Sequence, residues 1–588
     1  MIFVENVKKY LKYLFKTYSL FFKAAKAVTL VIIILTPLEA FVPLASVQAS
    51  QEIVNRLSRN QGFMTAFIIW VIATFLIQLL PAVRTNIQGV LTDKLTGFVN
   101  ISLMKKSREL KFLELFDDSE YFDNLKMLQS DASWRPVNLI VFGMSILQQL
   151  LILLGMFILL GSYNIFLTLV LLTVLVPQTL VYYKIQQAAF ETMVTRSKNA
   201  RKLDYLSSLL LDRQDAKEVR LFSMFKAVIF RYTNLFNQTQ KTVNSVRKKQ
   251  MWTATFFLTL VILTTSYGFY WFIVQVQNAS LAIGSLLMYI SVVAYITDSM
   301  TRLVEDASLL YDSLLWIEKY YDFMDYHETK KDGKQLFTDT FEQLAVKNLS
   351  FTYPFSNHEV LHNVSFTVKN GEKIAIVGEN GSGKTTLVKL LLRFYDCNQG
   401  SIMWDKTDIK SYDIEDYRQH FSAVFQDFSR FKLSLQDNLT AMNEKKRDLK
   451  EILRKVGLYD KFKNDGVTLQ TILSKEFQGG VDLSGGQWQK VALARDLYMD
   501  RPIEILDEPT AALDARSEQE IYEIFLNENR NKTIFFITHR MSLVNLADKV
   551  LYLKDGQVHG FATHEQLMQD DPDYRELYEI QRKAYINS

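Results

Sequence analysis

Two long stretches without a charged residue limit what this chain can fold into. Residues 136–183 and residues 250–297 each run for 48 residues without an Asp, Glu, Lys or Arg. A helix that crosses a membrane needs roughly 20 apolar residues, so each stretch predicts two membrane-spanning helices joined by a short turn. The turns are expected at residues 161–164 and 278–280, where Gly-Ser-Tyr-Asn and Asn-Ala-Ser interrupt the apolar runs.

A third pair of spans is expected closer to the N-terminus, at residues 27–50 and 60–83, which makes six in all. The second of these two segments is uncharged, and the first contains one acidic residue, Glu39. An acidic side chain at the centre of a membrane helix costs about 2.5–3.5 kcal/mol on insertion scales. Glu39 is therefore expected to face a cavity and to contact a cationic substrate. The alternative is a position near the outer interface, or a hydrogen bond to a neighbouring helix.

The positions of the cations predict the orientation, because Lys and Arg near helix ends are retained in the cytoplasm. Six lysines lie between residues 8 and 26, whereas the first loop on the opposite side carries Arg56 and Arg59 as its cations. The N-terminus is therefore expected in the cytoplasm. Residues 4–22 suit a helix lying in the membrane interface. A cleaved signal peptide is the alternative, and the long basic region and the five spans that follow disfavour it.

The segments between the predicted pairs, residues 84–135 and 184–249, are far longer than a connection requires. They are charged and helical in pattern, which predicts that the membrane helices extend into the cytosol. The small net charge of +4 argues against a nucleic-acid partner spread over the whole surface. Cys397 is the only cysteine, so an intrachain disulfide or a cysteine-rich metal site is excluded as well.

A polar linker at residues 331–340 separates the membrane half from a C-terminal half with a different pattern. Short apolar strands alternate there with helices, as is typical of an α/β domain. The strand at 373–377 leads into a complete phosphate-binding loop, in which glycines let backbone N–H groups curl around phosphates. Lys384 would supply charge to the phosphates, and the Thr385 hydroxyl would ligate Mg²⁺. The residues of this motif are Gly378, Glu379, Asn380, Gly381, Ser382, Gly383, Lys384, Thr385 and Thr386.

A second acidic element follows the apolar run at residues 503–506. Asp507 would hold the Mg²⁺ ion, directly or through water, and Glu508 would polarise the attacking water as a general base. A helix-capping Asp and a solvated Glu are the alternatives. Glu504 interrupts a strand that should be apolar on both faces, so it is expected near an exposed start of this strand.

Between these two motifs stands a segment that resembles the signature of the ATP-binding cassette family, Leu483-Ser484-Gly485-Gly486-Gln487. In that family this segment opens a helix whose N-terminus binds the γ-phosphate of ATP held by the other subunit. The resemblance implies that nucleotide is bound by Ser484, Gly485, Gly486 and Gln487. It also implies an adenine-stacking role for Tyr353, a switch role on Mg²⁺ and water for Gln426, an aspartate loop at Asp514 and a γ-phosphate switch at His539.

The order of the two halves resembles the exporter branch of this family. The resemblance implies a six-helix membrane domain at residues 1–330, the linker at 331–340, and an ATP-binding α/β domain of the P-loop type at 341–588. It further implies a homodimer in the cytoplasmic membrane, with two shared sites for ATP and Mg²⁺ and with the ATPase domain in the cytoplasm. Residues 116–122 and 215–222 look like the coupling segments of exporters, and Glu476 looks like the acidic loop that they touch.

Residues 480–482 and 488–490, which flank the signature, look most like those of bacterial peptide, bacteriocin and lantibiotic exporters. A peptide is therefore the expected substrate. A lipid or drug exporter, a heterodimer, and a regulatory membrane ATPase without net transport remain the alternatives. Some relatives carry an N-terminal cysteine peptidase, which this chain cannot form with its single cysteine in the ATPase domain.

Overall fold

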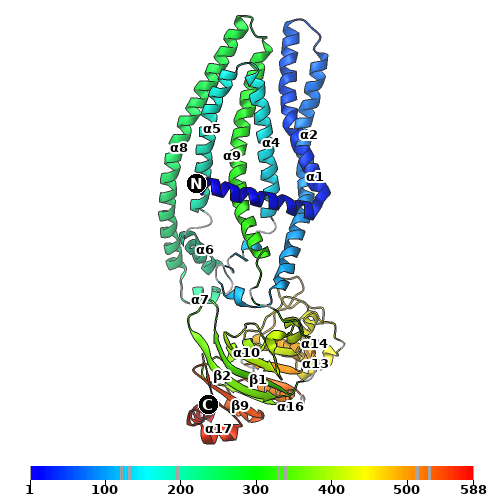
Figure 1. Ribbon diagram of the computed structural model, residues 1–588, viewed down its shortest axis with the longest axis vertical. Helices are drawn as coiled ribbons and strands as arrows, with labels where there is room; N and C mark the ends of the chain where they lie inside the picture. The colour runs from blue at the N-terminus through cyan, green and yellow to red at the C-terminus, as the bar shows by residue number, and fades with distance from the viewer. Residues whose placement is uncertain are drawn as a thin grey trace. The chain divides into compact units, whose positions relative to one another are not determined.

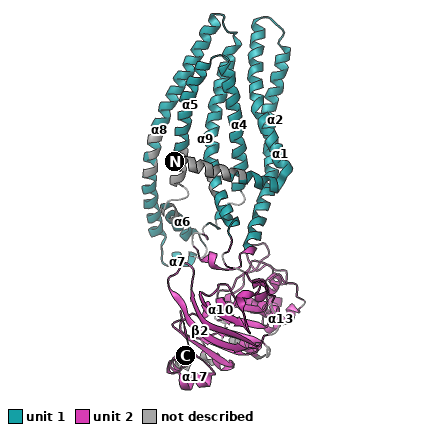
Figure 2. Ribbon diagram, in the orientation of Figure 1, with its two compact units in different colours: residues 1–107, 124–326 teal, residues 108–123, 327–588 magenta. Residues whose placement is uncertain are grey.

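The computed structural model forms two compact units, which Figures 1 and 2 show as ribbons. Unit 1 contains Met1–Ser107 and Asn124–Tyr326, and unit 2 contains Arg108–Asp123 and His327–Ser588. The structure describes the chain apart from residues 1, 119–120, 122–123, 126, 130–133, 194–197, 213–214, 329, 331, 337–340, 446, 510–514, 528–531, 539 and 587–588. The second unit thus combines two parts of the chain that are far apart in the sequence.

Unit 1 is built from long helices. They are α1 (Ile2–Ser58), α2 (Met64–Glu109), α4 (Arg135–Gly161), α5 (Ile165–Met193), α6 (Lys198–Leu211), α7 (Ala216–Leu221), α8 (Phe225–Gln277) and α9 (Gly284–Met324). The helices end at Gly161 and Gln277, so both predicted turns are confirmed. Ala25 has non-helical backbone angles, φ −156° and ψ 72°, and this break separates the expected interfacial helix from the first span. The helices α2, α5 and α8 run well beyond the predicted spans, as expected, and the cytosolic location of these extensions stays a prediction.

Five helical segments among the described residues are long and apolar enough to cross a membrane. They are Lys16–Ser58, Met64–Glu109, Arg135–Gly161, Ile165–Lys184 and Met251–Gln277. The helix at the sixth predicted span, α9, is not in this group, so the count of six stays a prediction. Large apolar side chains such as Ile69, Ile72 and Leu263 are exposed on these helices, as expected for surfaces that meet lipid.

The interior of unit 1 is an apolar core shared by α1, α4, α5, α8 and α9. Met156, Phe272, Met288 and Val292 are each 0% exposed within it. The ring centroids of Phe272 and Tyr289 lie 4.8 Å apart, which joins α8 to α9. Hydrophobic burial cannot drive helices together inside lipid, so close packing of this kind holds such a bundle.

Glu39 lies inside this bundle and does not face a cavity. Its side chain is 2% exposed, and its Oε2 lies 2.7 Å from Nη1 of Arg84 on α2. The same guanidinium group donates to Oε1 of Gln148 on α4. Pairing with a cation inside the bundle costs less than leaving a carboxylate unpaired in an apolar environment. The expectation of a cavity-facing carboxylate is therefore wrong for this structure, and a contact with a neighbouring helix replaces it.

Replacing Glu39 by Gln should destabilise unit 1, because Arg84 would keep its charge and lose its counter-charge. We expect Glu39→Gln to lower the free energy of unfolding by about 3 kcal/mol. Thermal unfolding of the full chain in detergent would measure this loss. The neutral double variant Glu39→Gln with Arg84→Gln should recover much of it. Equal stability of Glu39→Gln and the wild type would show that the ion pair is unimportant.

Unit 2 contains two β-sheets with helices around them. Its strands are β1 (Gln343–Thr352), β2 (Glu359–Lys369), β3 (Lys373–Val377), β4 (Gln399–Trp404), β5 (Thr407–Asp408), β6 (Phe421–Val424), β7 (Ile503–Asp507), β8 (Thr533–Ile537), β9 (Lys549–Lys554) and β10 (Gln557–Ala562). One sheet has the order β2-β1-β4-β5 and is antiparallel. The other has the order β10-β9-β3-β8-β7-β6, in which only the edge strand β10 is antiparallel to its neighbour among the described strands.

The larger sheet is buried on both faces. Ile374 and Ile376 of β3 contribute to one apolar core, whereas the alternate residues Ala375 and Val377 contribute to another. This arrangement follows from the period of two in a strand and is typical of parallel sheets covered on both sides. The helical elements of unit 2 are η1 (Glu114–Asp117), α10 (Lys384–Leu391), η2 (Ile409–Ser411), α11 (Ile414–Arg418), α12 (Leu435–Thr440), α13 (Leu449–Lys455), α14 (Tyr459–Asn464), α15 (Gly485–Met499), α16 (Ala515–Asn527), η3 (Met541–Leu546), α17 (His564–Asp570) and α18 (Pro572–Ile586).

Glu504 is the second acidic residue whose surroundings differ from the expectation. It lies on β7, its side chain is 0% exposed, and it forms an ion pair with Lys532, which precedes β8. The expected exposed position is therefore wrong. A cation 28 residues further along the chain compensates the buried carboxylate, and no local sequence pattern could have indicated this partner.

The segment Arg108–Asp123, which begins with the last two residues of α2, is part of unit 2. Lys111 Nζ lies 2.6 Å from Oδ2 of Asp332, whose Oδ1 accepts a hydrogen bond from the Ile414 N–H at 2.9 Å. Phe112 is 4% exposed, and its N–H donates to Oε1 of Glu328 at 2.9 Å. Residues just before the predicted ATPase domain thus hold this segment within unit 2.

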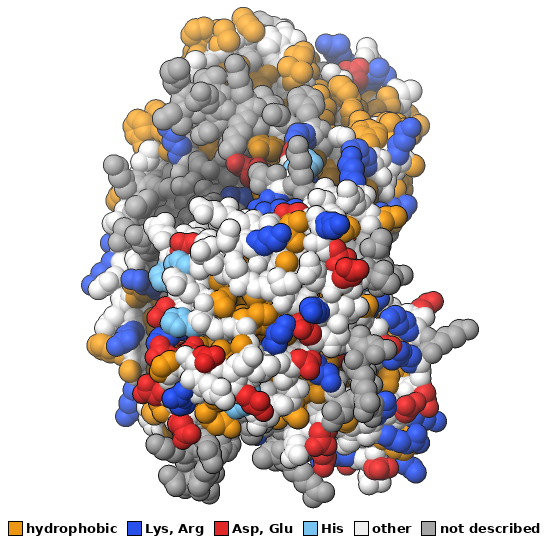
Figure 3. All heavy atoms as spheres, turned by 60° about the horizontal axis from the view of Figure 1, so that its bottom comes forward, with side chains coloured by type: hydrophobic (Ala, Val, Ile, Leu, Met, Phe, Trp, Pro, Cys, Tyr) orange, Lys and Arg blue, Asp and Glu red, His pale blue; other side chains and the backbone are white. Residues whose placement is uncertain are grey.

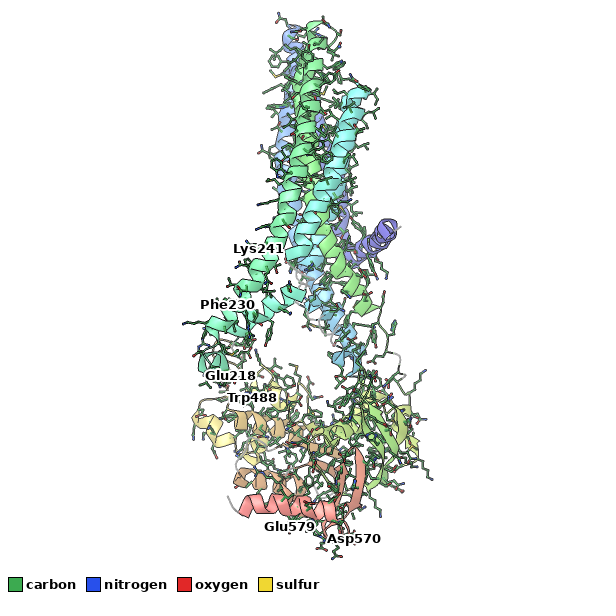
Figure 4. The ribbon with its side chains drawn as sticks, turned by 90° about the vertical axis from the view of Figure 1, so that its left-hand side faces the viewer. Glu218, Phe230, Lys241, Trp488, Asp570 and Glu579 are labelled. Carbon is green, nitrogen blue, oxygen red and sulfur yellow. The ribbon has the colours of Figure 1, made fainter. Side chains whose placement is uncertain are left out.

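The Asp332 carboxylate accepts hydrogen bonds from Lys111 and from the Ile414 N–H, so removing it should weaken the attachment of residues 108–118 to the rest of unit 2. We expect Asp332→Ala to lower the opening free energy of amides in residues 108–118 by about 1–3 kcal/mol. Native-state hydrogen exchange with mass spectrometry would measure it. The exposed Asp570 of α17, labelled in Figure 4, offers the matched control Asp570→Ala, which should leave these amides unchanged. Unchanged exchange in Asp332→Ala would contradict the contact.

The other predicted coupling segment, residues 215–222, forms α7 and the residue on either side of it in unit 1. Glu218 lies on α7, and Phe230 and Lys241 lie further along α8, as Figure 4 shows. Phe222 and Phe230 are 68% and 65% exposed. On the face of the molecule in Figure 3, basic and acidic side chains are interspersed, in keeping with the small net charge.

Candidate nucleotide-binding site

The predicted site residues follow the carboxyl ends of neighbouring parallel strands. The phosphate-binding loop follows β3, Gln426 follows β6, and Asp507 and Glu508 stand at the end of β7. Since β3, β8, β7 and β6 are adjacent and parallel, these strand ends meet at one edge of the sheet. Ligands bind in open α/β sheets at such an edge.

The loop after β3 has the backbone that an anion cradle requires. Gly381 and Gly383 have φ values of +84° and +96°, which favour glycine over residues with a side chain. A Cβ atom on Gly383 would also lie 2.5 Å from the Leu361 side chain. Gly383 caps helix α10 without a side-chain hydrogen bond, so the first N–H groups of this helix stay available to a phosphate.

Lys384 begins α10 and points back into the loop. Its Nζ donates to the carbonyl oxygens of Gly378 at 2.9 Å and Glu379 at 2.8 Å. Burial lowers the pKa of the Lys384 ammonium group, while the nearby carboxylates of Glu508 and Asp507 raise it. The two carbonyl oxygens thus position the Lys384 ammonium group within the loop, where it can also donate to phosphate oxygens.

Asp507 and Ser382 have polar atoms that suit a bound Mg²⁺ ion and phosphate. Asp507 is 1% exposed, and its carboxyl group is hydrogen-bonded to Thr385. Its Oδ1 atom is buried and has no hydrogen-bond partner in the part of the chain that the structure describes. Burial raises the pKa of this carboxyl, and the bond to Thr385 opposes that shift. The Ser382 hydroxyl is likewise buried without a partner. Buried polar atoms without partners are costly, and a ligand that engages them removes this cost.

No group of three or more His, Cys, Asp or Glu side chains able to hold a metal occurs among the described residues. A magnesium ion that keeps waters and is shared with phosphate oxygens needs no such group, since one carboxylate and one hydroxyl suffice on the protein side. Thr385 and Asp507 fit that description.

Glu508, the predicted general base, is hydrogen-bonded to Gln426. Gln426 Nε2 donates to Oε2 of Glu508 at 2.8 Å. Glu508 has a φ of +46°, an uncommon conformation for a residue with a side chain, and its N–H donates to Ile537 of β8 at 3.2 Å. A strained conformation held by the neighbouring strand is a feature of many functional sites. The hydrogen bond from Gln426 orients the Glu508 carboxylate.

A cavity of about 560 Å³ brings most of these residues together. The predicted residues that line it are Asn380, Gly381, Gly383, Lys384, Thr385, Thr386, Gln426 and Glu508. Val360 of β2 also lines it and was not predicted, because a lone valine carries no chemical signal in the sequence. The volume is in the range of ligand pockets.

Tyr353 lies beside the phosphate-binding loop without lining this cavity. Its hydroxyl is 3.0 Å from Oγ1 of Thr386, and its ring packs edge to face against Phe351 and Tyr395. The Lys389 ammonium group lies 5.6 Å from the centroid of the same ring. This placement is beside the phosphate end of the site, and adenine stacking on Tyr353 stays a prediction.

The signature segment opens helix α15, as expected. Ser484 Oγ accepts from the Gln487 N–H at 3.3 Å, and Gln487 Oε1 accepts from the Ser484 N–H at 2.7 Å, which forms a capping box. Ser484 and Gly485 are exposed. None of the four predicted residues, Ser484, Gly485, Gly486 and Gln487, is among those that line the cavity of the same chain.

Two predicted residues, Asp514 and His539, lie outside the described residues, so their roles stay predictions. Glu476 is described, and both of its carboxylate oxygens accept from Lys432 Nζ, at 2.6 Å and 2.7 Å.

Comparison with known proteins supports this description of unit 2. Residues 361–511 match the family model described as ABC transporter. Over nearly the whole length, the chain is 29% identical to the nisin transport ATP-binding protein of Lactococcus lactis subsp. lactis, with 96% of this chain and 95% of the relative covered. It is 27% identical to the subtilin transport ATP-binding protein of Bacillus subtilis, with 97% and 94% covered.

Other similarities cover less of the chain. The ATP-dependent lipid A-core flippase of Vibrio cholerae is 33% identical over 264 residues, which is 44% of this chain and 45% of the relative. Among solved structures, a bacterial Atm1-family ABC exporter with ATP bound matches with a TM-score of 0.78 and 21% identity, covering 95% of this chain and 99% of that one. Nearly the whole chain thus has a fold similar to that of this structure.

Proposed function

We propose that this ABC transporter, a multi-pass membrane protein that couples ATP hydrolysis to export, moves a peptide across the cytoplasmic membrane as a homodimer. The observation that carries the choice of substrate is the full-length similarity to the transport proteins of nisin and subtilin. The residues on either side of the signature, which are part of that same similarity, resemble those of peptide, bacteriocin and lantibiotic exporters.

The lipid flippases are similar to this chain over about half of its length. The two transport proteins are similar over at least 94% of both partners, membrane half included. Since the membrane half is the part that meets the substrate, full-length similarity is the better guide to substrate class. A lipid or drug exporter therefore remains the second candidate.

In the proposed reaction, Glu508 acts as general base on the water that attacks the γ-phosphate, and Gln426 orients that carboxylate. Lys384 and the backbone N–H groups at the start of α10 bind the phosphates. Thr385 and Asp507 hold Mg²⁺, which neutralises phosphate charge when bound. The exposed N-terminus of α15 completes the site of a second copy of the chain.

The proposed orientation places the N-terminus and unit 2 in the cytoplasm, where ATP is available. Closure of two ATPase units on ATP would bias the membrane domains toward an outward-facing state, and hydrolysis would reset them. The positive charge around the N-terminus supports this orientation.

Transport by the purified chain in liposomes tests the proposal. We expect ATP-dependent uptake of a radiolabelled peptide fraction from the host cell, and none with Glu508→Gln. Parallel assays with a fluorescent phospholipid and a cationic dye distinguish the alternatives. Movement of lipid or dye without peptide would favour the second candidate. ATP hydrolysis without movement of any probe would indicate a regulatory membrane ATPase.

A further inference from the structure

A second cavity lies within unit 1, between α5, α8 and α9. Its volume is about 200 Å³, and its lining contains no Asp, Glu, Lys or Arg side chain. Five of its ten lining residues are apolar, and the other five are Gln178, Thr179, Tyr182, Thr297 and Thr301. Leu258 is 50% exposed and Thr297 and Thr301 are exposed as well, so the cavity is open at the surface of the bundle. A cavity that combines neutral polar groups with apolar ones is suited to a ligand of the same mixed kind.

The three threonines already have hydrogen-bond partners within their own helices. Their hydroxyls donate to carbonyl oxygens one turn earlier, at 2.8 Å for Thr179, 2.9 Å for Thr297 and 3.0 Å for Thr301. This bond is a common way for threonine to be satisfied in a helix. The threonine hydroxyl protons are therefore already used, although each hydroxyl oxygen can still accept a hydrogen bond.

Gln178 and Tyr182 differ from the threonines in their hydrogen bonding. They are four residues apart on α5, so their side chains share one helix face. Among the described residues, neither the Gln178 amide nor the Tyr182 hydroxyl forms a hydrogen bond, and both line the cavity. Tyr182 is 36% exposed and Gln178 is half-buried, so both polar groups are accessible to a ligand able to hydrogen-bond.

The location of the cavity suits a ligand that arrives from the cytoplasm in the proposed orientation. Its lining residues on the three helices lie close in sequence to Lys184, Lys249 and Asp298, the charged residues at the predicted cytoplasmic ends of the spans. A volume of about 200 Å³ is below the range of drug-sized pockets, so it suits one side chain and its adjoining peptide group.

We propose that this cavity binds one apolar side chain of the exported peptide, with Gln178 and Tyr182 as hydrogen-bond partners of the adjoining backbone amide. The inference rests on the proposed function and names the kind of segment that is recognised, an uncharged apolar one. A charged side chain is excluded by cost, since the lining has no counter-charge to offer.

Photo-crosslinking to the full chain in nanodiscs tests the inference without requiring transport or ATP. The probe is an acetylated and amidated leucine tripeptide with a diazirine, compared with its N-methylated counterpart, which lacks the amide donors. Mass spectrometry locates the label. We expect the amide probe to label α5, α8 and α9 about three- to tenfold more than the N-methylated probe, as one hydrogen bond predicts.

The variants Gln178→Leu and Tyr182→Phe should each reduce this preference, while the N-methylated probe labels them as it labels the wild type, which shows that the cavity persists. Gln78→Leu on α2 makes the same change outside the lining and should keep the full preference. Equal labelling by both probes, or an intact preference in Gln178→Leu, would overturn the inference. Labelling as expected in a chain that fails to transport peptide in liposomes would count against the proposed function alone.

Discussion

Glu508→Gln is expected to bind ATP as the wild type does and to hydrolyse it at least ~10²-fold more slowly. The phosphate-binding loop, Lys384 and the Asp507 carboxylate stay intact in this variant, so the loss falls on activation of water. Gln is close in size to Glu and can still contact Gln426, which limits any structural change. Steady-state phosphate release and equilibrium nucleotide binding by the purified chain would measure the two effects separately.

The same substitution at Glu451, on α13 and outside the cavity lining, is the matched control and should leave turnover unchanged. Near-normal turnover by Glu508→Gln would refute its assignment as general base. Loss of nucleotide binding together with turnover would instead point to damage to the fold of the site.

Lys384→Ala and Gly485→Asp should each abolish ATPase activity, and a mixture of the two chains should regain some of it. Lys384→Ala removes the charge that the loop directs at the phosphates, with an expected loss of at least ~10²-fold. Gly485 is exposed, and a Cβ atom there would meet no other atom within 4 Å, so Asp is accommodated within its own chain. Its carboxylate would repel the γ-phosphate bound by the partner.

In a mixed dimer one site carries both defects and the other carries neither. ATPase activity measured after reassembly from detergent should therefore return, provided that one intact site turns over without the other. The exposed N-terminus of α15, which is absent from the cavity lining of its own chain, is the structural basis of this expectation. A monodisperse monomer that hydrolyses ATP at the full rate at every dilution would contradict the shared site.

The parts of the site that were predicted from sequence depend on contiguous residues. The phosphate-binding loop needs glycines at fixed places because its backbone must adopt positive φ values, and this need is visible in eight consecutive letters. Asp507 and Glu508 follow an apolar strand directly, so their place at the end of a buried strand could also be predicted. The membrane helices were predictable for a similar reason, since lipid demands long apolar runs.

The predictions that failed concern partners distant in the sequence. Glu39 is paired with Arg84 on the next helix, and Glu504 with Lys532 on the way into the next strand. An acidic residue in an apolar segment predicts that a nearby cation offsets the cost of burying its charge. The sequence alone does not identify which cation this is. Val360, which lines the cavity, was not predicted because a single valine in a strand has no sequence feature that distinguishes a lining residue from a core residue.

The presence of Arg108–Asp123 in unit 2 has a consequence for the number of membrane crossings. This segment precedes α4, whereas the rest of unit 2 begins after α9, and a single compact unit must lie on one side of the bilayer. The chain between them must then cross an even number of times. By apolar length alone, α4, α5 and α8 give three crossings, which is odd. Parity therefore predicts that α9 crosses as well, although it is not among the helices found long and apolar enough to do so. With α1 and α2 the total becomes six.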